Sequence, residues 1–595
     1  MTRLFNDPAA FADEALEGFT AAHRRWVRPV TGGVVRATAT PAGQVAVVIG
    51  GGSGHYPAFS GLVGRGLAHG AAVGNVFASP SARQIHSVAT AAHAGGGVLL
   101  MYGNYAGDVL HFGQAAERLA ADGIETRTFA VADDISSAGP EESAKRRGIA
   151  GDLPVFKAAA AAAEQGLPLE EVLRVAERAG ARTRSFGIAF SGCTLPGADH
   201  PLFTVPEARM AVGLGIHGEP GIGEEALPTA DEAARLLVET LLKELPEDVA
   251  DPAGQRAAVI LNGLGSVKYE ELFVVYRRVA ALLGDAGVEI VDPEVGELVT
   301  SFDMAGMSLT LTWLDDRLEE LWRAPADTPA YRKGALDAAV PDLDRAPVTA
   351  AAQDTAVPAA PVVPAAPVVP AAPVVPAASD ASRRAAGTVL AALDAVARVV
   401  DAHADELGRI DAVAGDGDHG IGMRRGSTAA HRAAADAHGL GAGAGTVLTR
   451  AADAWADKAG GTSGALWGTI LRSLGTALGD RDAPDAARVA EGVTEASAAV
   501  RGLGGAEVGD KTMVDVLVPF ADALAAATGE GLPLADAWDR AATTATAAAA
   551  GTADLLPRRG RARPHAEKSL GTPDAGAHSL ALITRAVHGA LLDHH

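Results

Sequence analysis

The sequence predicts an α/β domain followed by an all-α helical domain, because its two parts differ in pattern and a proline-rich repeat divides them. In the first part, short apolar runs alternate with helical periodicity, which is typical of α/β architecture with largely parallel sheets. In the second part, alanine-rich amphipathic segments recur with almost no strand pattern, which indicates a helical bundle. We expect the first domain, the linker and the second domain at residues 1–345, 346–381 and 382–595.

The linker carries the motif PVVPAA three times in succession, over residues 361–378. Proline at every third position forbids helices and sheet ladders and favours polyproline II. At roughly 3.1 Å per residue, the stretch from 357 to 378 could span about 70 Å. We interpret it as a spacer that tethers two domains; a ligand for a proline-recognition module is the alternative.

Six apolar runs in the first part predict strands. Val45–Ile49 leads directly into a glycine turn at Gly50–Gly52, and glycine-rich turns at strand ends are where such sheets usually bind ligands. The other runs are Val98–Tyr102, Thr126–Ala132, Ala257–Leu261, Val288–Val291 and Ser308–Trp313. Helical periodicity is clear in Val109–Ala121 and Tyr269–Leu283, and in the second part in Ala386–Ala402, Thr446–Ala456, Ala486–Arg501 and Val514–Ala527.

The overall composition excludes several classes of protein. A net charge of −23 argues against sequence-independent binding of nucleic acid, which needs clustered Lys and Arg. Cys193 is the only cysteine, so a disulfide framework and multi-thiolate zinc sites are excluded. The uncharged stretch from 84 to 107 contains histidines and glycines, and the acidic N-terminus is unlike a signal peptide. We expect a soluble, cytoplasmic protein that binds neither nucleic acid nor membrane.

Two windows, 213–218 and 415–420, satisfy the dinucleotide pattern G-x-G-x-x-G. Neither follows a convincing strand, and the second contains aspartates that would repel a bare pyrophosphate. We therefore do not predict a Rossmann site. The sequence also contains no G-x-x-x-x-G-K-[ST] loop, which excludes a P-loop kinase.

Three aspartates, Asp411, Asp416 and Asp418, lie within eight residues of a glycine-containing loop between predicted helices. Carboxylates so close together repel one another, and hard oxygen donors at this density suit Mg²⁺. They could fix Mg²⁺ against the phosphates of a nucleotide. An acidic surface loop is the alternative.

A second loop, at residues 460–464, precedes an apolar helix that we expect to begin near Ala465. Its glycines let successive N–H groups turn toward an anion, and Thr462 and Ser463 add hydroxyl groups. Beside the aspartates, this loop predicts a phosphate-binding site. On its own it would be read as a helix N-cap.

Polar side chains of the first part also lie in glycine-rich turns. His55 ends the run Gly52-Ser53-Gly54-His55, Asp108 follows a predicted strand, and His217 lies within 213–218. Lone histidines are usually structural, but three such groups predict a site for a small polar ligand.

Six motifs together resemble the single-chain, ATP-dependent dihydroxyacetone kinase family. They are G-G-G-S-G-H at 50–55, N-Y-A-G-D at 104–108, G-I-H-G-E-P-G at 215–221, G-D-G-D-H-G at 415–420, G-T-S-G at 461–464 and G-D-K-T-M at 509–513. The resemblance covers nearly the whole chain in the family's order. It implies a substrate domain of two α/β subdomains, an eight-helix nucleotide domain, ATP and Mg²⁺ as cofactors, and a homodimer.

The resemblance also implies roles for the matching residues. His217 would add to the carbonyl of a ketone, which selects ketoses over polyols, and Asp108 and His55 would assist removal of a proton from the attacking hydroxyl. Substrate contacts are expected at Gly52, Ser53, Gly54 and Gly103, and Mg²⁺ ligands at Asp411, Asp416 and Asp418. Nucleotide contacts are expected at His419, Gly420, Ile421, Gly422, Thr462, Ser463, Thr512, Met513, Arg561, Asp574, Ala575 and Gly576.

The sequence departs from the family pattern near the ketose pocket. Gly103 stands where the family typically has lysine, and Tyr56-Pro57-Ala58-Phe59 replaces Glu-Pro-Ala-His. The turn at 572–576 also differs, which weakens the expected nucleotide contacts there. Loss of a lysine side chain would free volume for a longer ketose, so the family's erythrulose kinases become the favoured comparison.

The function predicted in this way is ATP-dependent phosphorylation of a hydroxymethyl group of a short-chain ketose, erythrulose or dihydroxyacetone, held covalently on His217. Dihydroxyacetone kinase proper and a catalytically silent ketose-binding regulator are the alternatives. A subunit of a phosphohistidine relay and a fatty-acid kinase are disfavoured, because both domains are fused and the first is of the ketose-binding type.

Overall fold

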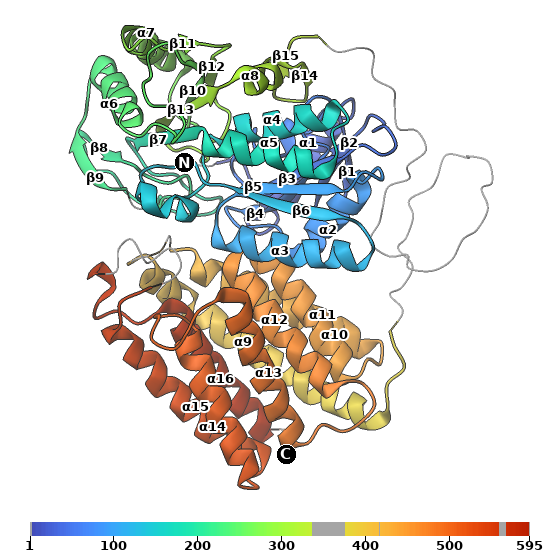
Figure 1. Cartoon of the computed structure of the whole chain (residues 1–595). Coiled ribbons are helices and arrows are strands. Elements are labelled where there is room, and N and C mark those ends of the chain that lie inside the picture. Colours follow the sequence, from blue (N-terminus) through green and yellow to red (C-terminus); the bar gives the residue numbers. More distant parts are fainter. Residues whose placement is uncertain are drawn as a thin grey trace.

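The computed structural model describes residues 3–219, 221–335, 375–413, 415, 417–558 and 567–593. An α/β part built from the first 335 residues lies against a separate bundle of helices, with helix α3 (Ala106–Ala121) of the α/β part facing the bundle (Figure 1). Both predicted domains are present, and the α/β part divides into two subdomains, each with its own sheet.

The first sheet has the strand order β1-β2-β4-β3-β5-β6. Its strands are β1 (Val27–Val30), β2 (Gly33–Arg36), β3 (Ala46–Ser53), β4 (Gly70–Val76), β5 (Val98–Gly103) and β6 (Thr126–Val131). The four strands from β4 to β6 pair in parallel, and β1 and β2 add an antiparallel edge. The predicted parallel arrangement is thus confirmed for this subdomain.

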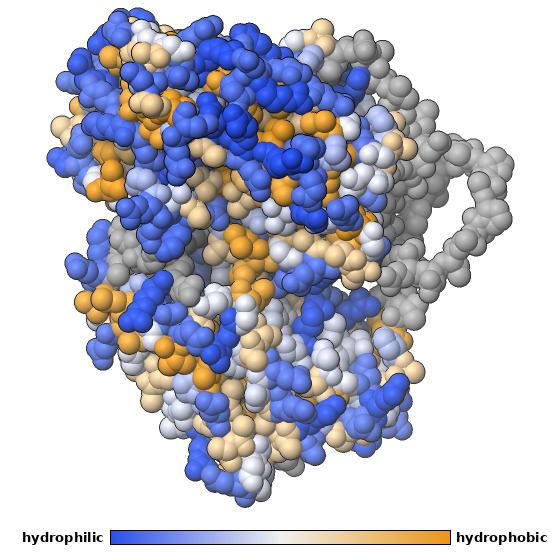
Figure 2. Space-filling model, viewed as in Figure 1, coloured by the Kyte–Doolittle hydropathy of each residue, from blue (hydrophilic) through white to orange (hydrophobic). Residues whose placement is uncertain are grey.

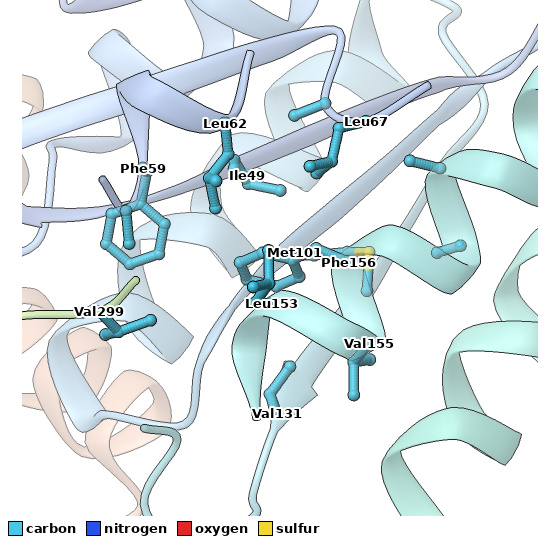
Figure 3. Packing of buried hydrophobic residues seen from close by; sticks show 14 of the residues in the cluster. Ile49, Phe59, Leu62, Leu67, Met101, Val131, Leu153, Val155, Phe156 and Val299 are labelled. Atoms are coloured by element: carbon cyan, nitrogen blue, oxygen red, sulfur yellow. The ribbon is translucent and has the colours of Figure 1, made fainter. Parts of the chain in front are cut away.

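Helices cover both faces of this sheet, which explains why its central strands are continuous apolar runs. They are α2 (Ala82–Ala92) and α3 on one face and α4 (Asp152–Glu164) and α5 (Leu169–Ala181) on the other. Alternate residues of β3 belong to opposite cores. Ile49 packs in the core that also contains Met101 and Phe156 (Figure 3), while Val48 packs against the α2 and α3 side.

The glycine turn expected at Gly50–Gly52 is wrong, because β3 continues through these glycines to Ser53. A Cβ atom at Gly51 would lie 2.3 Å from the ring of Phe59, and one at Gly50 would lie 2.5 Å from the carbonyl oxygen of Ala72. Glycine serves here to let the strand pass close to its neighbours.

The second sheet has the order β11-β10-β13-β7-β8-β9, with β12 also paired to β10. Its strands are β7 (Thr183–Ala189), β8 (Arg209–Val212), β9 (Gly223–Ala226), β10 (Arg256–Gly263), β11 (Glu289–Ile290), β12 (Glu294–Gly296) and β13 (Gly306–Leu314). Four of its six pairings are antiparallel, including the long β10–β13 pairing, so the expectation of largely parallel sheets is wrong for this subdomain.

Helices α6 (Ala230–Leu242) and α7 (Tyr269–Asp285) pack on the second sheet. Helix α1 (Phe11–Ala22), helix α8 (Asp316–Arg323) and a two-stranded ribbon of β14 (Ala326–Asp327) and β15 (Arg332–Lys333) complete the described α/β part. The window at 213–218 directly follows β8, contrary to expectation. No helix follows it, because the chain returns as the antiparallel strand β9, and a Rossmann site is still excluded.

Eight α-helices form the described part of the second domain. They are α9 (Asp380–Asp411), α10 (His419–Gly439), α11 (Ala444–Ala459), α12 (Gly461–Leu478), α13 (Ala486–Gly504), α14 (Val514–Gly529), α15 (Leu534–Gly551) and α16 (Ala575–Asp593). Each packs on the next in sequence, and α16 packs on α9, so the eight helices close into a barrel. Its core includes the stacked rings of Trp455 and Trp467, with centroids 5.0 Å apart.

The two domains meet along α2 and α3 on one side and α11 and α12 on the other. Ser81 donates a hydrogen bond to Asp457 at 2.5 Å, and Arg83 forms an ion pair with the same carboxylate. Lys458 pairs with Asp13 at 2.7 Å. Figure 2 shows a mostly hydrophilic face on the α/β part, with scattered apolar patches, one of which lies at the junction. Among the described residues, no helix is long and apolar enough to cross a membrane.

Candidate active site

Two histidines from different subdomains meet at the centre of the α/β part. His217 lies in the turn between β8 and β9, and His55 follows β3. Their Nε2 atoms are 3.0 Å apart, and the rings are edge-on with centroids 4.7 Å apart. The Nδ1 atom of His55 is 2.7 Å from the carbonyl oxygen of Thr300. The two histidines expected to bind the ketose are thus in direct contact.

The hydrogen bonds assign the protons of this pair. Burial, and then the charge of His217, lower the pKa of His55 to about 3, so its ring is neutral at neutral pH. Since a carbonyl oxygen only accepts, His55 carries its proton on Nδ1 and donates it to Thr300. Its bare Nε2 therefore accepts a hydrogen bond from Nε2–H of His217.

Glu219 completes this chain of contacts and is the site residue that the sequence reasoning missed. Its Oε1 lies 3.0 Å from Nδ1 of His217, and its Oε2 accepts the backbone N–H of His217 at 3.0 Å. The carboxylate therefore holds a proton on Nδ1 and fixes the ring orientation. An acidic residue two positions after the candidate nucleophile, within the motif at 215–221, was the sequence pattern that could have identified it.

Aromatic rings enclose the histidine pair. Phe77 stacks on His55 with centroids 4.8 Å apart and meets His217 edge-on at 5.3 Å. The ring of Tyr105 lies edge-on to His217 at 4.5 Å, and burial raises the pKa of its hydroxyl well above the usual range. These rings shield the imidazole of His217 from water.

Asp108 lies in the first turn of α3 and is buried. It is three residues after Tyr105, which is the N-cap residue of the same helix. Burial, the charge of Asp133 and the charge of Asp108, in decreasing order of effect, raise the pKa of Asp152. Asp108 therefore lies near Asp152, whose charge also acts on Tyr105.

The glycines before His55 are required by packing. A Cβ atom at Gly52 would lie 2.7 Å from the backbone nitrogen of Ala78, and Gly54 has a φ of +100°. The hydroxyl of Ser53 donates to the carbonyl oxygen of Gly74 at 3.0 Å. Substrate contacts at Gly52, Ser53 and Gly54 stay predictions.

The free volume expected at Gly103 is absent next to its backbone. A Cβ atom there would lie 3.3 Å from the ring of Tyr105 and 3.4 Å from Oδ2 of Asp152. The other carboxylate oxygen of Asp152 is buried and has no hydrogen-bond partner among the described residues. Gly103 thus faces an aromatic ring and a buried acid.

On the other side of the junction, Asp411 ends α9 and Asp418 immediately precedes α10. Oδ2 of Asp411 accepts the backbone N–H of Gly417 at 2.9 Å. Loss of hydration, and then the charge of Asp411, raise the pKa of Asp418 to about 7. Asp416 lies outside the described residues, and within the described ranges no group of three or more His, Cys, Asp or Glu side chains is arranged around a common metal position.

Helix α12 begins at Gly461, four residues earlier than expected, so Thr462 and Ser463 lie in its first turn. The hydroxyl of Ser463 is 3.3 Å from Nδ1 of His419, and Nε2 of His419 is 3.0 Å from the hydroxyl of Ser579. The predicted nucleotide residues Gly420, Ile421 and Gly422 follow His419 in the first turn of α10.

The remaining predicted nucleotide residues come from the ends of α14 and α16. Met513 immediately precedes α14, and a Cβ atom added at Gly576 would lie 3.4 Å from the Cβ atom of Met513. Thr512 directly precedes Met513 in the chain, and Ala575 directly precedes Gly576. Oδ2 of Asp574 accepts the N–H of Ala577 at 2.8 Å, and partial burial raises the pKa of Asp574 to about 7. Arg561 lies outside the described residues.

Residues predicted to bind the ketose and residues predicted to bind the nucleotide come close together at the domain junction. The pKa of Asp418 is raised by loss of hydration, by the charge of Asp411 and, to a smaller extent, by the charge of Glu219. At the same junction, a Cβ atom at Gly107 would lie 2.9 Å from Cα of Gly461. The residues predicted for catalysis and for nucleotide binding therefore border one region.

Comparisons with known proteins agree with this architecture. The Dak1 domain matches residues 17–330 and the DAK2 domain matches residues 413–589. The chain is 61% identical over 591 residues to the L-erythrulose kinase of Pectobacterium atrosepticum, covering 99% of this chain and 97% of that protein. It is 56% identical over 588 residues to the D-erythrulose kinase of Mycolicibacterium smegmatis, covering 99% and 98%.

Among solved structures, the dihydroxyacetone kinase from C. freundii in complex with AMP-PNP and Mg²⁺ aligns over 99% of both chains, with 28% identity and a TM-score of 0.51. That enzyme and this protein therefore share the order of an α/β part and a helical part. With its Dak1 and DAK2 domains joined in one polypeptide, this chain belongs to the single-chain, ATP-dependent dihydroxyacetone kinase family.

Proposed function

We propose that this protein transfers the terminal phosphoryl group of ATP to a hydroxymethyl group of a short-chain ketose, with erythrulose as the preferred substrate. The observation that carries the proposal is the His55–His217–Glu219 chain of contacts, of which Glu219 is close enough to the other domain for its charge to act on Asp418. The two erythrulose kinases that resemble this chain over nearly their whole length support the choice of substrate.

The histidine pair supports covalent capture of the ketose. The proton on Nε2 of His217 first passes to the bare Nε2 of His55, which frees the lone pair of Nε2 of His217 to attack the carbonyl carbon. His55 then gives this proton to the carbonyl oxygen, which becomes the hydroxyl of a hemiaminal. Glu219 keeps the proton on Nδ1 and balances the positive charge of the substituted ring. A polyol such as glycerol has no carbonyl and cannot form this bond.

Transfer then needs a base for the attacking hydroxyl and compensation for phosphate charge. We assign the first role to Asp108. Asp411, Asp416 and Asp418 would hold Mg²⁺, and the raised pKa of Asp418 beside Asp411 fits a carboxylate pair that a cation stabilises. Bound Mg²⁺ would neutralise charge on the transferring phosphoryl group. His419, Ser463 and Met513, with their neighbours, would contact the nucleotide.

Substrate identity is tested by measuring ATP consumption with dihydroxyacetone, D-erythrulose, L-erythrulose, glyceraldehyde and glycerol. We expect turnover with the ketoses, the highest kcat/KM with an erythrulose, and none with glycerol. Turnover of glycerol at the same rate would contradict capture through a carbonyl. Higher kcat/KM with dihydroxyacetone than with either erythrulose would identify a dihydroxyacetone kinase.

The metal assignment is tested by Asp416→Asn. We expect turnover to be abolished while calorimetry still detects ketose binding, because the ketose site lies in the other domain. Loss of ketose binding together with activity would contradict the assignment. The homodimer and the cytoplasmic location are retained as proposals, and light scattering of the purified chain measures the former.

A further inference from the structure

Helix α3 touches the predicted sites of both domains. Its first turn carries Asp108, the proposed base, and the same end of the helix packs on α12, whose first turn contains Thr462 and Ser463. Gly107 and His111 are four residues apart and therefore lie on one face of α3. Both touch Gly461, at the start of α12.

His111 makes one hydrogen bond across the junction. Its Nε2 lies 3.0 Å from the carbonyl oxygen of Gly461, so Nε2 carries the proton and donates. The side chain is buried, and burial lowers its pKa to about 4, which keeps the ring neutral at neutral pH. Its Nδ1 has no hydrogen-bond partner in the part of the chain that the structure describes. The bond to Gly461 is therefore the polar contact that orients this ring.

The absence of a side chain at Gly107 allows the starts of α3 and α12 to approach each other closely. A Cβ atom at this position would lie 2.9 Å from Cα of Gly461 and 3.0 Å from the backbone nitrogen of Thr462. Backbone atoms cannot yield as a flexible side chain can. Any larger residue at 107 would therefore push the start of α12 away from the start of α3.

We infer that His111 and Gly107 are positioning residues, which hold the Gly461–Ser463 turn against the start of α3 so that a phosphoryl donor on this turn meets the ketose hydroxyl beside Asp108. This inference rests on the proposed kinase function. Phosphoryl transfer depends mainly on placement, and a misplacement of about 1 Å can cost about 100-fold in rate.

The first test replaces the hydrogen-bond donor. His111→Leu keeps an apolar side chain without a donor, and His111→Gln offers an amide N–H in place of Nε2–H. We expect kcat to fall about 100-fold in His111→Leu, with KM values for ketose and ATP changed less than about threefold. His111→Gln should restore kcat to within about tenfold of wild type. A role in folding alone would lower the melting temperature and would not be rescued by the amide.

The second test uses two alanine substitutions on the same helix. Gly107→Ala adds a Cβ atom at the junction, whereas Gly113→Ala adds one where no atom lies within 4 Å. Alanine has the higher helix propensity, so neither variant should lose stability within α3. We expect kcat to fall about 100-fold in Gly107→Ala and to stay at the wild-type level in Gly113→Ala.

Hydrogen exchange gives a readout that does not depend on activity. In the nucleotide-free protein, we expect faster exchange of the amides at 461–465 in His111→Leu and Gly107→Ala, and unchanged exchange in Gly113→Ala. Unchanged exchange in the first two variants, or wild-type kcat in His111→Leu, would overturn the inference. If the wild type phosphorylates no ketose, the proposed function fails, and the exchange measurement still decides whether these residues hold the turn.

Discussion

At the scale of single residues, Glu219 determines the state of His217. Its carboxylate accepts from both Nδ1 and the backbone N–H of the histidine, within a shell formed by Phe77 and Tyr105. A buried carboxylate in this position stabilises positive charge on the imidazole, as in other histidine-based sites. The same charge is present when the ring carries the ketose.

Glu219→Gln tests this role. The amide keeps the shape of the side chain but loses its charge, so we expect kcat/KM for the ketose to fall about 100-fold. Steady-state kinetics measures the change, and Glu224→Gln, at an exposed position of β9, serves as the matched control. Equal kcat/KM in wild type and Glu219→Gln would show that the carboxylate does not support the reaction.

Because Gly103 already packs against Tyr105 and Asp152, a lysine there would act on substrate length by displacing these neighbours and not by filling an open space. Gly103→Lys would place an ammonium beside Asp152, whose pKa is raised well above the usual range by burial, Asp133 and Asp108, and would press on Tyr105. We expect kcat/KM to fall by about 10–100-fold more for erythrulose than for dihydroxyacetone.

Gly103→Ala is the control, because its Cβ atom alone lies at contact distance from Tyr105 and Asp152. It shows which part of the change in kcat/KM comes from adding any side chain and which part needs the lysine. Both substrates are measured on all three proteins. Equal losses for the two ketoses in Gly103→Lys would remove the argument that this position selects the longer substrate.

At the scale of elements, an ion pair joins the end of α4 to β2. Arg36 is buried, and its Nη1 lies 2.5 Å from Oε1 of Glu164. Burial opposes ionisation of Glu164, but the charge of Arg36, together with His69 and the hydrogen bonds from Gly66 and Arg36, outweighs it, and the pKa of Glu164 falls to about 2. A carboxyl group whose pKa is lower in the folded than in the unfolded state stabilises the fold when it is ionised. For Glu164 this stabilisation is fully present above the unfolded pKa of 4.5, and it is lost as the pH falls toward the folded pKa of about 2.

Glu164→Gln should therefore lower the free energy of unfolding by about 2 kcal/mol at pH 7, allowing for the partial exposure of the side chain. The difference from wild type should shrink as the pH falls below 4.5. Urea unfolding at pH 7, 5 and 4 measures it, with the exposed Glu177→Gln as control. A difference that is constant with pH would show that ionisation of Glu164 is not the cause.

At the scale of the whole molecule, the proline-rich linker joins two domains that also make direct contact. Val375, in the third repeat, packs against the core of the helical domain, so the deletion that tests the tether should spare it. Removal of residues 361–366 should change kcat by less than about threefold, because effective concentration varies slowly with linker length. Complete loss of activity, with both domains folded by circular dichroism, would assign a docking role to the repeat.

Local pattern in the sequence determined much of the architecture. The apolar runs of β5 and β6 and the amphipathic segments of α11 and α13 were predicted to within a few residues, because burial on one or both faces dictates which positions are apolar. The identity of His55, Asp108 and His217 as candidate residues also came from local motifs. The domain boundary was predicted at the repeat because proline every third residue excludes regular secondary structure.

Only the tertiary structure decided which of these residues meet and how. His55 and His217 are 162 residues apart, and their contact depends on the docking of two sheets. The glycines of β3 have low strand propensity, yet Phe59 and Ala72 pack so closely that only glycine fits. The antiparallel pairing of β10 with β13 and the contact of His111 with Gly461 likewise arise from packing between distant segments. The spacing of apolar residues shows which face of a helix or strand is buried. It does not show which distant segment covers that face, because such contacts depend on the free energy of packing whole layers and domains together.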